Sequence, residues 1–366
     1  MQGGDCPLRL VAPRGSVSAT FQRGVAVLGA GDLVGEEVLR LLAAGGEPFP
    51  HVHALDVGAA VGEPVDYGDA RLVVEDAMAF EYAHAGVVLS SVDRATAARC
   101  LPIARSAGCL IVDASGLFRA DPHALTVVIG VNPEALERLT SLPGEVVMTP
   151  GHAVVQALRV LVPLQQRFGL RRVNLLVCHP AARSGKAGVE RLARESAHAL
   201  NGHGLEHTHP HAEPRGVVRA FGVTTLAAAA TNGDDEIATL ARQLVELLGQ
   251  TELDVRVTEL VIPVFYDCTL AFDLELEESV DAVGVRDALA STGGVDVGVE
   301  GSASEVDSGL HVSSAADGTS LRLQWLEAPR AGGKLSLGTT GDAIRCGSAA
   351  EQVGILRHLL GMGRQG

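Results

Sequence analysis

The sequence predicts two α/β domains, the first built on a doubly wound parallel sheet. Between residues 24 and 115, short runs rich in Val, Leu and Ile alternate with stretches of helical period. Such alternation is typical of β-α-β units on a parallel sheet. A length of 366 residues suggests about two domains. After Pro150 the pattern changes to a long apolar helix and the strands of a second, mixed sheet.

The elements of the first domain follow one another with little ambiguity. A buried strand over 24–28 leads into a glycine turn and a helix over 36–44, and the remaining elements alternate in the same way. These are a strand at 51–56, a strand at 86–91, a helix at 94–106 and a strand at 110–113.

The second domain contains longer elements. A helix is predicted over 153–168, and Asn232-Gly233-Asp234 marks the start of another over 235–248. The remaining predictions are a strand at 173–178, a helix at 188–200, strands at 255–265, 270–276 and 321–325, and a final helix at 349–360.

The composition excludes several classes of protein. Hydrophobic residues make up 47% and charged residues 20%, which excludes a disordered chain. A formal net charge of −15 argues against nucleic acid or an anionic membrane as partner. No apolar run approaches the roughly 20 residues that span a bilayer, and residues 1–22, which lack a secretory signal, are interpreted as a disordered extension. The six cysteines have no paired spacing, which predicts free thiols and a cytoplasmic location.

The glycine turn after the first strand is a candidate dinucleotide site. Glycines let the backbone approach a pyrophosphate, and the helix start supplies amide donors. Asp56 ends the second strand, where a carboxylate would bond a ribose hydroxyl, and with no Lys or Arg beside it NAD is favoured over NADP. Two alternatives remain: the glycines serve only packing, and Asp56 is only a surface acid. Asp32 counts against phosphate binding because its charge lies at the phosphate end of the turn. The candidate cofactor residues here are Gly29, Gly31, Val34, Gly35 and Asp56.

A histidine-rich stretch is the one other cluster of interest. His207, His209 and His211 have alternate spacing, but Pro210 favours an exposed loop, and no cysteine or paired acid stands at ligand spacing beside them. A solvated loop is therefore the favoured interpretation, adventitious weak metal binding is the alternative, and no structural or catalytic metal site is predicted.

Seven short motifs follow one another between about residues 24 and 362. They are VLGAGDLVG at 27–35, IVDASGLFR at 111–119, VVIGVNP at 127–133, TPGHAVVQ at 149–156, RSGKAG at 183–188, VIPVFYDC at 261–268 and DAIRCGSA at 342–349. Together they resemble the motifs of the aspartate-semialdehyde dehydrogenase family.

The resemblance implies a Rossmann-type domain at 23–150, a catalytic and dimerisation domain at 151–340, and a C-terminal helix at 341–366 that packs back on the first domain. It also implies a homodimer and a reaction in which a cysteine thiolate attacks an aldehyde or acyl phosphate, a histidine acts as acid and base, and hydride passes to or from a nicotinamide. By this resemblance, Arg119 would contact phosphate; the alternative is a structural arginine that pairs with a buried carboxylate. The further cofactor residues implied by the resemblance are Ser90, Ser91, Ser184 and Gly185.

The catalytic positions depart from that pattern. His152 stands at the nucleophile position and Cys268 at the histidine position, so the two residue types are exchanged. One hypothesis makes Cys268 the nucleophile and His152 its base, provided both lie in one cleft. The plainer interpretation is that Cys268 is a half-buried strand thiol and that His152 begins a helix and bonds backbone or water.

Other substrate groups are also missing. The carboxylate-gripping arginine falls at Val261, the phosphate-binding lysine at Ala238, and two asparagines at Ala114 and Ala343. The pattern resembles the Usg-like branch of the family, which lacks a full catalytic set. Three functions stay open: a catalytically impaired protein that binds NAD(H), an active NAD(P)-dependent semialdehyde dehydrogenase of amino-acid biosynthesis with altered residues, and a ligand-free interaction subunit.

Overall fold

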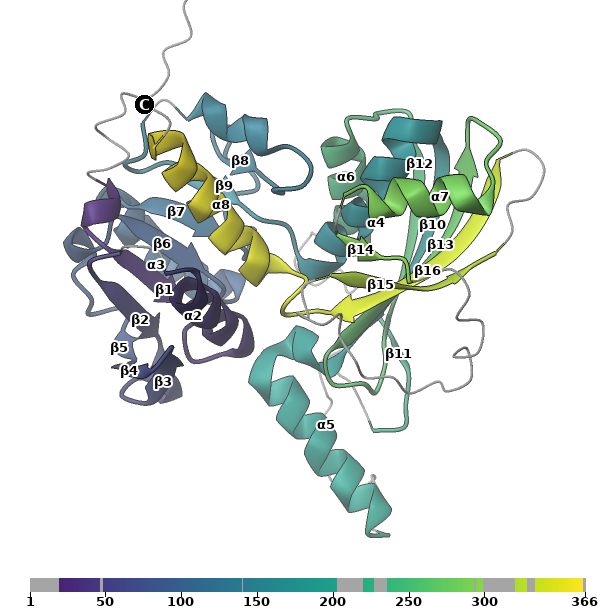
Figure 1. Ribbon diagram of the computed structural model, residues 1–366. Coiled ribbons are helices and arrows are strands. Elements are labelled where there is room, and N and C mark those ends of the chain that lie inside the picture. Colours follow the sequence, from purple (N-terminus) through teal and green to yellow (C-terminus); the bar gives the residue numbers. More distant parts are fainter. Residues whose placement is uncertain are drawn as a thin grey trace, which may run out of the picture. The chain divides into compact units, whose positions relative to one another are not determined.

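The protein folds into two compact units, shown in a computed structural model (Figure 1). It describes residues 20–46, 49–139, 141–202, 220–226, 236–292, 294–298, 320–327 and 333–364. The first unit comprises the described residues up to Pro150 together with those from Glu351 onward, and the second unit runs from Gly151 to Ala350.

The first unit is built on a seven-stranded sheet in which every pair of neighbouring strands is parallel. The strand order is β5-β2-β1-β6-β7-β9-β8, so the chain moves outward from β1 first on one side and then on the other. This confirms the doubly wound parallel sheet. The strands are β1 (Val25–Leu28), β2 (Val52–Asp56), β5 (Glu75–Asp76), β6 (Val87–Ser90), β7 (Leu110–Asp113), β8 (Leu125–Thr126) and β9 (Val146–Met148).

The helices of this unit are α2 (Leu33–Gly45), α3 (Arg94–Ser106) and most of α8 (Ser348–Arg364). Helix α2 begins three residues before the predicted start because Asp32 caps it, its side chain accepting a hydrogen bond from the Leu33 amide. Helix α8 is tied to the sheet by Gln352, whose amide donates to the carbonyl oxygen of Ser90. Smaller elements are a hairpin of β3 (Pro64–Tyr67) and β4 (Ala70–Val73), and the 3₁₀ turns η1 (Gly58–Ala60), η2 (Tyr82–His84) and η3 (Pro133–Arg138).

The prediction that residues 1–22 form a disordered extension is wrong for residues 20–22, which belong to the folded first unit. Thr20 and Phe21 are buried, and the Phe21 ring packs 6.3 Å from that of Phe49. Burial of this aromatic side chain explains why the folded unit begins before residue 23. Residues 1–19 lie outside the described part of the chain.

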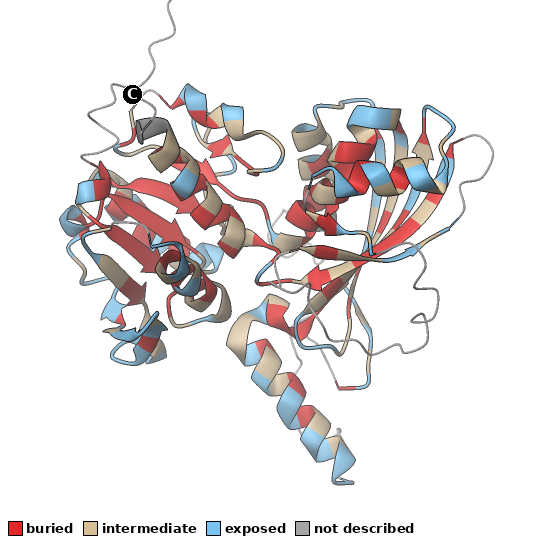
Figure 2. Ribbon diagram, viewed as in Figure 1, coloured by how far each residue is buried: buried red, intermediate tan, exposed pale blue. Residues whose placement is uncertain are grey.

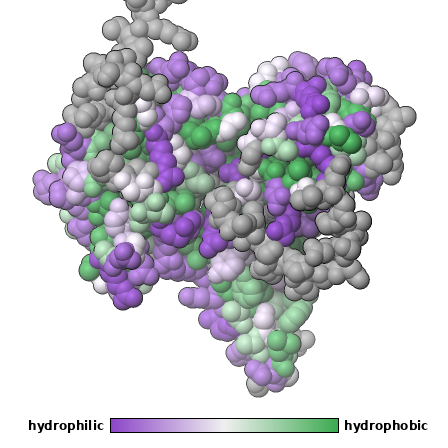
Figure 3. Space-filling view, in the orientation of Figure 1, coloured by the Kyte–Doolittle hydropathy of each residue, from purple (hydrophilic) through white to green (hydrophobic). Residues whose placement is uncertain are grey.

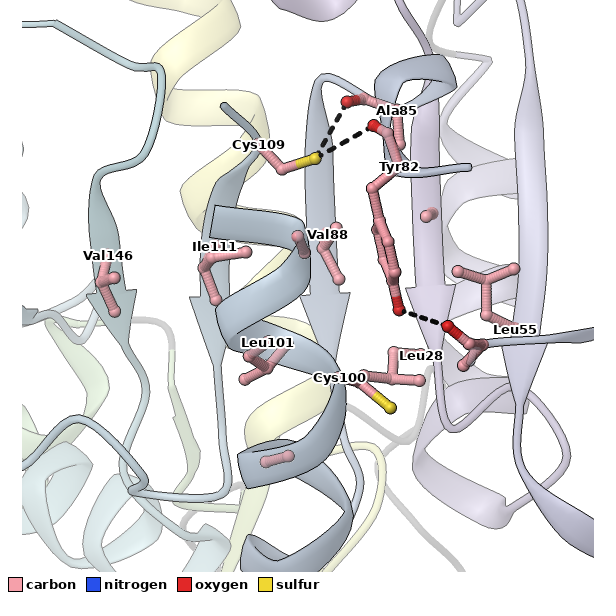
Figure 4. Packing of buried hydrophobic residues seen from close by; sticks show 14 of the residues in the cluster. Leu28, Leu55, Tyr82, Ala85, Val88, Cys100, Leu101, Cys109, Ile111 and Val146 are labelled. Carbon is pink, nitrogen blue, oxygen red and sulfur yellow. Dashed lines mark hydrogen bonds between the residues drawn. The ribbon is translucent and has the colours of Figure 1, made fainter. Parts of the chain in front are cut away.

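The core of the first unit is largely aliphatic. All residues of β1, β6 and β7 are buried, as the red strands in Figure 2 show. Tyr82 donates its hydroxyl to the carbonyl oxygen of Ala77 at 3.1 Å, and Cys109 donates its thiol to that of Ala85 at 3.1 Å (Figure 4). Burial raises the pKa of Cys109 to about 11, so this thiol is an inert core group. The five cysteines in the described residues are free thiols, as expected.

The second unit has a mixed sheet in the order β11-β12-β10-β13-β16-β15-β14. Strand β10 pairs in parallel with β12 and antiparallel with β13, which confirms the predicted mixed sheet. The strands are β10 (Leu170–His179), β11 (Thr224–Thr225), β12 (Asp254–Val261), β13 (Asp267–Leu276), β14 (Val295–Asp296), β15 (Leu321–Leu326) and β16 (Lys334–Asp342). The helices are α4 (His152–Phe168), α5 (Gly185–Leu200), α6 (Glu236–Leu248) and α7 (Ala282–Ala290), with the 3₁₀ turn η4 (Ala181–Ser184).

Two strand boundaries differ from the prediction. Strand β12 ends at Val261 instead of 265, where Pro263 has no amide hydrogen for a ladder bond and the carbonyl oxygen of Val264 accepts from the Ala181 amide instead. Strand β13 then begins at Asp267, so Cys268 lies inside a strand.

Strand β16 and helix α7 were not predicted. Glycine weakens the strand signal of β16, yet Gly338 is required there because the Trp325 ring occupies the space of its absent side chain. Among the described residues, no helix is both long enough and apolar enough to cross a membrane.

Candidate functional site

The glycine turn lies where the topology of the first sheet favours a ligand. In doubly wound sheets, ligands bind at the carboxyl ends of the strands where the strand order reverses. Here that point is the carboxyl end of β1 and β6, which are neighbours in the sheet. Gly29 directly follows β1, and a side chain on it would lie 3.0 Å from Val92, which follows β6.

The glycines of the turn are required by the backbone. Gly29 has a φ of 93°, a conformation that other residues rarely adopt. A Cβ on Gly35 would collide with the carbonyl oxygen of Gly29. The turn therefore folds tightly between β1 and α2, as both the packing and the dinucleotide interpretations require.

Asp56 lies against this turn. Its Oδ2 accepts a hydrogen bond from the Gly31 amide at 3.0 Å, and its Oδ1 accepts one from the Val57 amide at 2.8 Å. Each carboxylate oxygen has a second lone pair, so the half-buried Asp56 can also accept from a ribose hydroxyl. Glycine cradle and carboxylate together fit a dinucleotide. The exposed Asp32 at the start of α2 opposes it with a negative charge.

The two serines at the end of β6 contact the C-terminal helix. Gln352 of α8 donates to the Ser91 hydroxyl at 3.0 Å and to the Ser90 carbonyl oxygen at 3.1 Å. The Ser90 hydroxyl is buried and has no hydrogen-bond partner. Both serines thus lie at the carboxyl end of β6, where a dinucleotide site is expected, and Ser91 also holds α8 through Gln352.

A second candidate site is a buried chain of polar side chains in the second unit. His152 begins α4, His179 ends β10 and Glu259 lies on β12. The His152 Nε2 lies 3.2 Å from the His179 Nδ1, and the His179 Nε2 lies 3.3 Å from the Glu259 Oε1. His179 and Glu259 are 3% and 4% exposed, so this chain is shielded from water over most of its length.

Cys268 completes the cluster from β13. One ligand atom from each of His152, His179 and Cys268 lies within 4.8 Å of the other two. The two exchanged residues therefore lie close together within the second unit, and this proximity is one requirement of the cysteine–histidine hypothesis. The expectation of a half-buried thiol is wrong: Cys268 is 0% exposed, because its position on β13 faces the core.

The electrostatics of the cluster favour uncharged groups. Burial lowers the pKa of His152 to about 3, helped by the neighbouring His179 and by the positive charge of Arg183. Burial, together with the neighbouring Cys178 thiol, raises the pKa of the Cys268 thiol well above its usual range. His152 was expected to bond backbone or water; its partner is the ring of His179.

Gly347 explains how His152 fits. A side chain on Gly347 would lie 2.7 Å from the Cβ of His152. The glycine of the DAIRCGSA motif therefore leaves room for the histidine at the start of α4.

His179 and Glu259 were missed by sequence reasoning. The predicted strand stopped at Cys178, one residue before His179. Glu259 carried a signal, because a carboxylate at an inward position of an alternating strand needs a partner. Nothing local in the sequence identifies that partner as residue 179.

The other predicted site residues lie on several different elements. Arg119 is exposed in the first unit, beside Gly116. Val34 lies in the first turn of α2, and Ser184 and Gly185 form the junction of η4 and α5. Val261 is a buried residue packed against Ala181, Leu192 and Ala220. The histidines at 207, 209 and 211 and the side chain of Ala238 lie outside the described part of the structure.

Comparison with known proteins identifies the family. Residues 24–139 match the family described as semialdehyde dehydrogenase, NAD binding domain. A USG-1 protein homolog of Azotobacter vinelandii is 30% identical over 277 residues, which cover 75% of this chain and 80% of that protein. Aspartate-semialdehyde dehydrogenase 2 of Vibrio cholerae is 27% identical over 278 residues, which cover 75% of this chain and 80% of that protein.

The fold is shared as well. The structure of aspartate semialdehyde dehydrogenase II from Vibrio cholerae, complexed with ASA, matches with a TM-score of 0.80 at 24% identity, covering 92% of this chain and 97% of that one. The chain belongs to the aspartate-semialdehyde dehydrogenase family, in its Usg-like branch, and contains that family's NAD(P)-binding domain.

Proposed function

We propose that this chain binds a nicotinamide dinucleotide at the Gly29–Gly35 turn and has lost most or all of the aldehyde-oxidising turnover of its family. The observation that carries the proposal is the complete burial of Cys268, one of the two exchanged residues. A nicotinamide, when bound, accepts or donates hydride. The chain's own residues have to supply the nucleophile, and the arrangement in the second unit does not present one.

The buried thiol is poorly placed for attack on an aldehyde. A nucleophile has to approach the reacting carbon within about 3–3.5 Å, and displacement by about 1 Å can cost ~100-fold in rate. The Cys268 sulfur is covered by the core of its own unit. His152 occupies the nucleophile position, but its Nε2 is engaged with the ring of His179.

Substrate-gripping groups are also absent at the positions where the family resemblance places them. Val261 is 3% exposed and apolar, so it cannot pair with a carboxylate. Bidentate contacts of arginine with a carboxylate are among the strongest in such sites. The loss of nucleophile and clamp together removes more than ~3 kcal/mol of transition-state stabilisation, which is more than ~100-fold in rate.

We also propose NAD as the preferred dinucleotide and a homodimer as the assembled form. Asp56 beside the turn favours a free ribose hydroxyl over a phosphate group, because the carboxylate would repel the phosphate.

The homodimer is supported by exposed apolar side chains of the second unit. These are Phe221, Val264 and Phe265, which lie around the small cluster of Ala181 and Val261. Apolar residues also reach the surface over α5 (Figure 3). Such surfaces mark protein contacts.

A melting assay combined with a turnover assay tests the dinucleotide proposal. We expect NAD to raise the unfolding temperature of the full-length protein, more than NADP does. We expect no measurable formation of reduced nicotinamide with aspartate semialdehyde and phosphate. Absence of any effect of either nucleotide at millimolar concentration would instead favour a ligand-free interaction subunit.

The active alternative rests on one observation, the proximity of His152 and Cys268 in a single buried cluster. If turnover occurs and Cys268→Ser abolishes it, while Cys109→Ser in the other unit leaves it unchanged, the exchanged pair is a working dyad.

Light scattering tests the homodimer. We expect Phe265→Ser to weaken the dimer and Val283→Ser, a change at an exposed apolar position on α7, to leave the dimer intact.

A further inference from the structure

We propose that His152, His179 and Cys268 are the protein ligands of a divalent transition-metal ion of the zinc class. Glu259 holds His179 in position from behind. This site lies wholly within the second unit and is independent of whether a dinucleotide binds to the first.

The spacing of the two imidazoles matches two ligands of one ion. Tetrahedral zinc with Zn–N bonds of about 2.0–2.1 Å separates two nitrogen ligands by about 3.3–3.4 Å. The His152 Nε2 and the His179 Nδ1 are 3.2 Å apart. A zinc-bound sulfur lies about 3.5 Å from each nitrogen, whereas the three ligand atoms here fit within 4.8 Å. A shift of about 1 Å by the Cys268 side chain is within the reach of a χ1 adjustment.

Glu259 fixes the tautomer of His179 that a metal needs. The Nε2–H of His179 donates to the Glu259 Oε1, so Nδ1 keeps its lone pair and faces the His152 Nε2. Carboxylate–histidine–metal arrangements of this kind are the rule at protein zinc sites. The second oxygen of Glu259 is buried and has no hydrogen-bond partner, which is a cost that a positive charge nearby would offset.

A metal-bound thiolate and the Glu259 carboxylate supply two negative charges against the two of a divalent ion. Arg183 and the start of α4 add positive potential on the His152 side, which opposes a cation, so the bonds to the thiolate and the two imidazoles have to outweigh it. Two imidazoles and one thiolate suit zinc and cobalt, whereas magnesium and calcium prefer oxygen ligands.

Three protein ligands leave one position of a tetrahedral ion for water or another small ligand. His152, the first residue of α4, is the least buried of the three ligands. We therefore place the open position on the His152 side of the ion.

The rival metal binder is the histidine-rich stretch at 203–211, which contains no cysteine. Cobalt(II) separates the two, because only a thiolate ligand gives the near-ultraviolet sulfur-to-cobalt charge-transfer absorption. The full-length protein is stripped with a chelator, kept reduced with a phosphine, and titrated with Co²⁺. We expect one ion per chain with the charge-transfer band and visible bands of tetrahedral cobalt, all removed by added Zn²⁺.

Matched variants assign the ligands. Cys268→Ser should abolish the band, whereas Cys109→Ser, an equally buried thiol in the first unit, should retain it. The triple change His207→Ala, His209→Ala and His211→Ala should also retain it. No thiolate band in the unaltered protein, or a band that persists in Cys268→Ser, overturns the proposal.

Two further variants keep the test decisive if Cys268→Ser does not fold. His152→Gln removes a half-buried ligand and should weaken cobalt binding by at least tenfold. Glu259→Gln removes the charge behind His179 and should weaken it by about 10–100-fold. Circular dichroism in the absence of metal establishes that these variants are folded. Unchanged cobalt affinity in a folded His152→Gln would contradict the site.

Discussion

The glycine turn and the buried histidine–cysteine cluster are built in opposite ways. The turn is made of backbone, and its parts from Gly29 to Asp56 lie within 28 residues of sequence. The cluster is made of side chains from four elements, with residues from 152 to 268. The difference is that the first unit has a backbone turn whose geometry fits a dinucleotide, whereas the second unit carries exchanged histidine and cysteine residues within a buried polar set.

The largest expected effect concerns the buried cluster. His179→Leu leaves the Glu259 carboxylate buried without its partner, and loss of one member of a buried pair costs about 3–5 kcal/mol of unfolding free energy. The double change His179→Leu with Glu259→Leu should recover a large part of that loss. Denaturant unfolding measures both.

If the unfolding free energy of His179→Leu lay within about 0.5 kcal/mol of that of the unaltered protein, the side chains of the cluster would not depend on one another as described.

The second effect concerns the turn. Gly35→Ala places a methyl group against the backbone of Gly29, which cannot move aside as a side chain could, so we expect a loss of about 2–3 kcal/mol. Gly130→Ala is the matched control in the same unit, because its added methyl group meets open space. Equal stabilities of the two variants in urea would contradict the tight turn.

The smallest expected effect concerns the negative charge of Asp32 at the start of α2. Asp32→Asn keeps an oxygen to cap α2 but removes the negative charge at the helix start. We expect NAD(H) to bind about 2–5-fold more tightly, corresponding to ~0.3–1 kcal/mol. Calorimetric titration measures the affinity.

Asp281→Asn removes the same kind of cap charge from α7 in the other unit and should leave that affinity unchanged. Weaker binding by Asp32→Asn would place the phosphates elsewhere.

What could be predicted from the sequence follows the same division. In the first unit, β1, β2, β6, β7, α2, α3, the glycine turn and Asp56 were predicted because each depends on local periodicity or on a backbone requirement. The strands β5, β8 and β9 and the β3–β4 hairpin were not predicted. The exchange of His152 and Cys268 was visible through family motifs. His179 and Glu259 were not, because their meeting depends on β10 and β12 pairing in parallel across 80 residues of sequence.

The two incorrect predictions at Phe21 and at strand β16 also have physical causes. Phe21 was assigned to a disordered extension because a single aromatic residue shows no periodicity, yet its ring packs with that of Phe49. Strand β16 was missed because its glycines weaken the strand signal, and their use becomes evident only when the Trp325 ring covers Gly338.

The loss of aldehyde-oxidising turnover is tested most directly by a turnover measurement on the full-length protein with NAD, aspartate semialdehyde and phosphate, with Cys268→Ser and Cys109→Ser measured in parallel. We predict that all three proteins form no reduced nicotinamide above background while NAD still raises their melting temperatures. Rapid turnover that Cys268→Ser abolishes and Cys109→Ser preserves would contradict it.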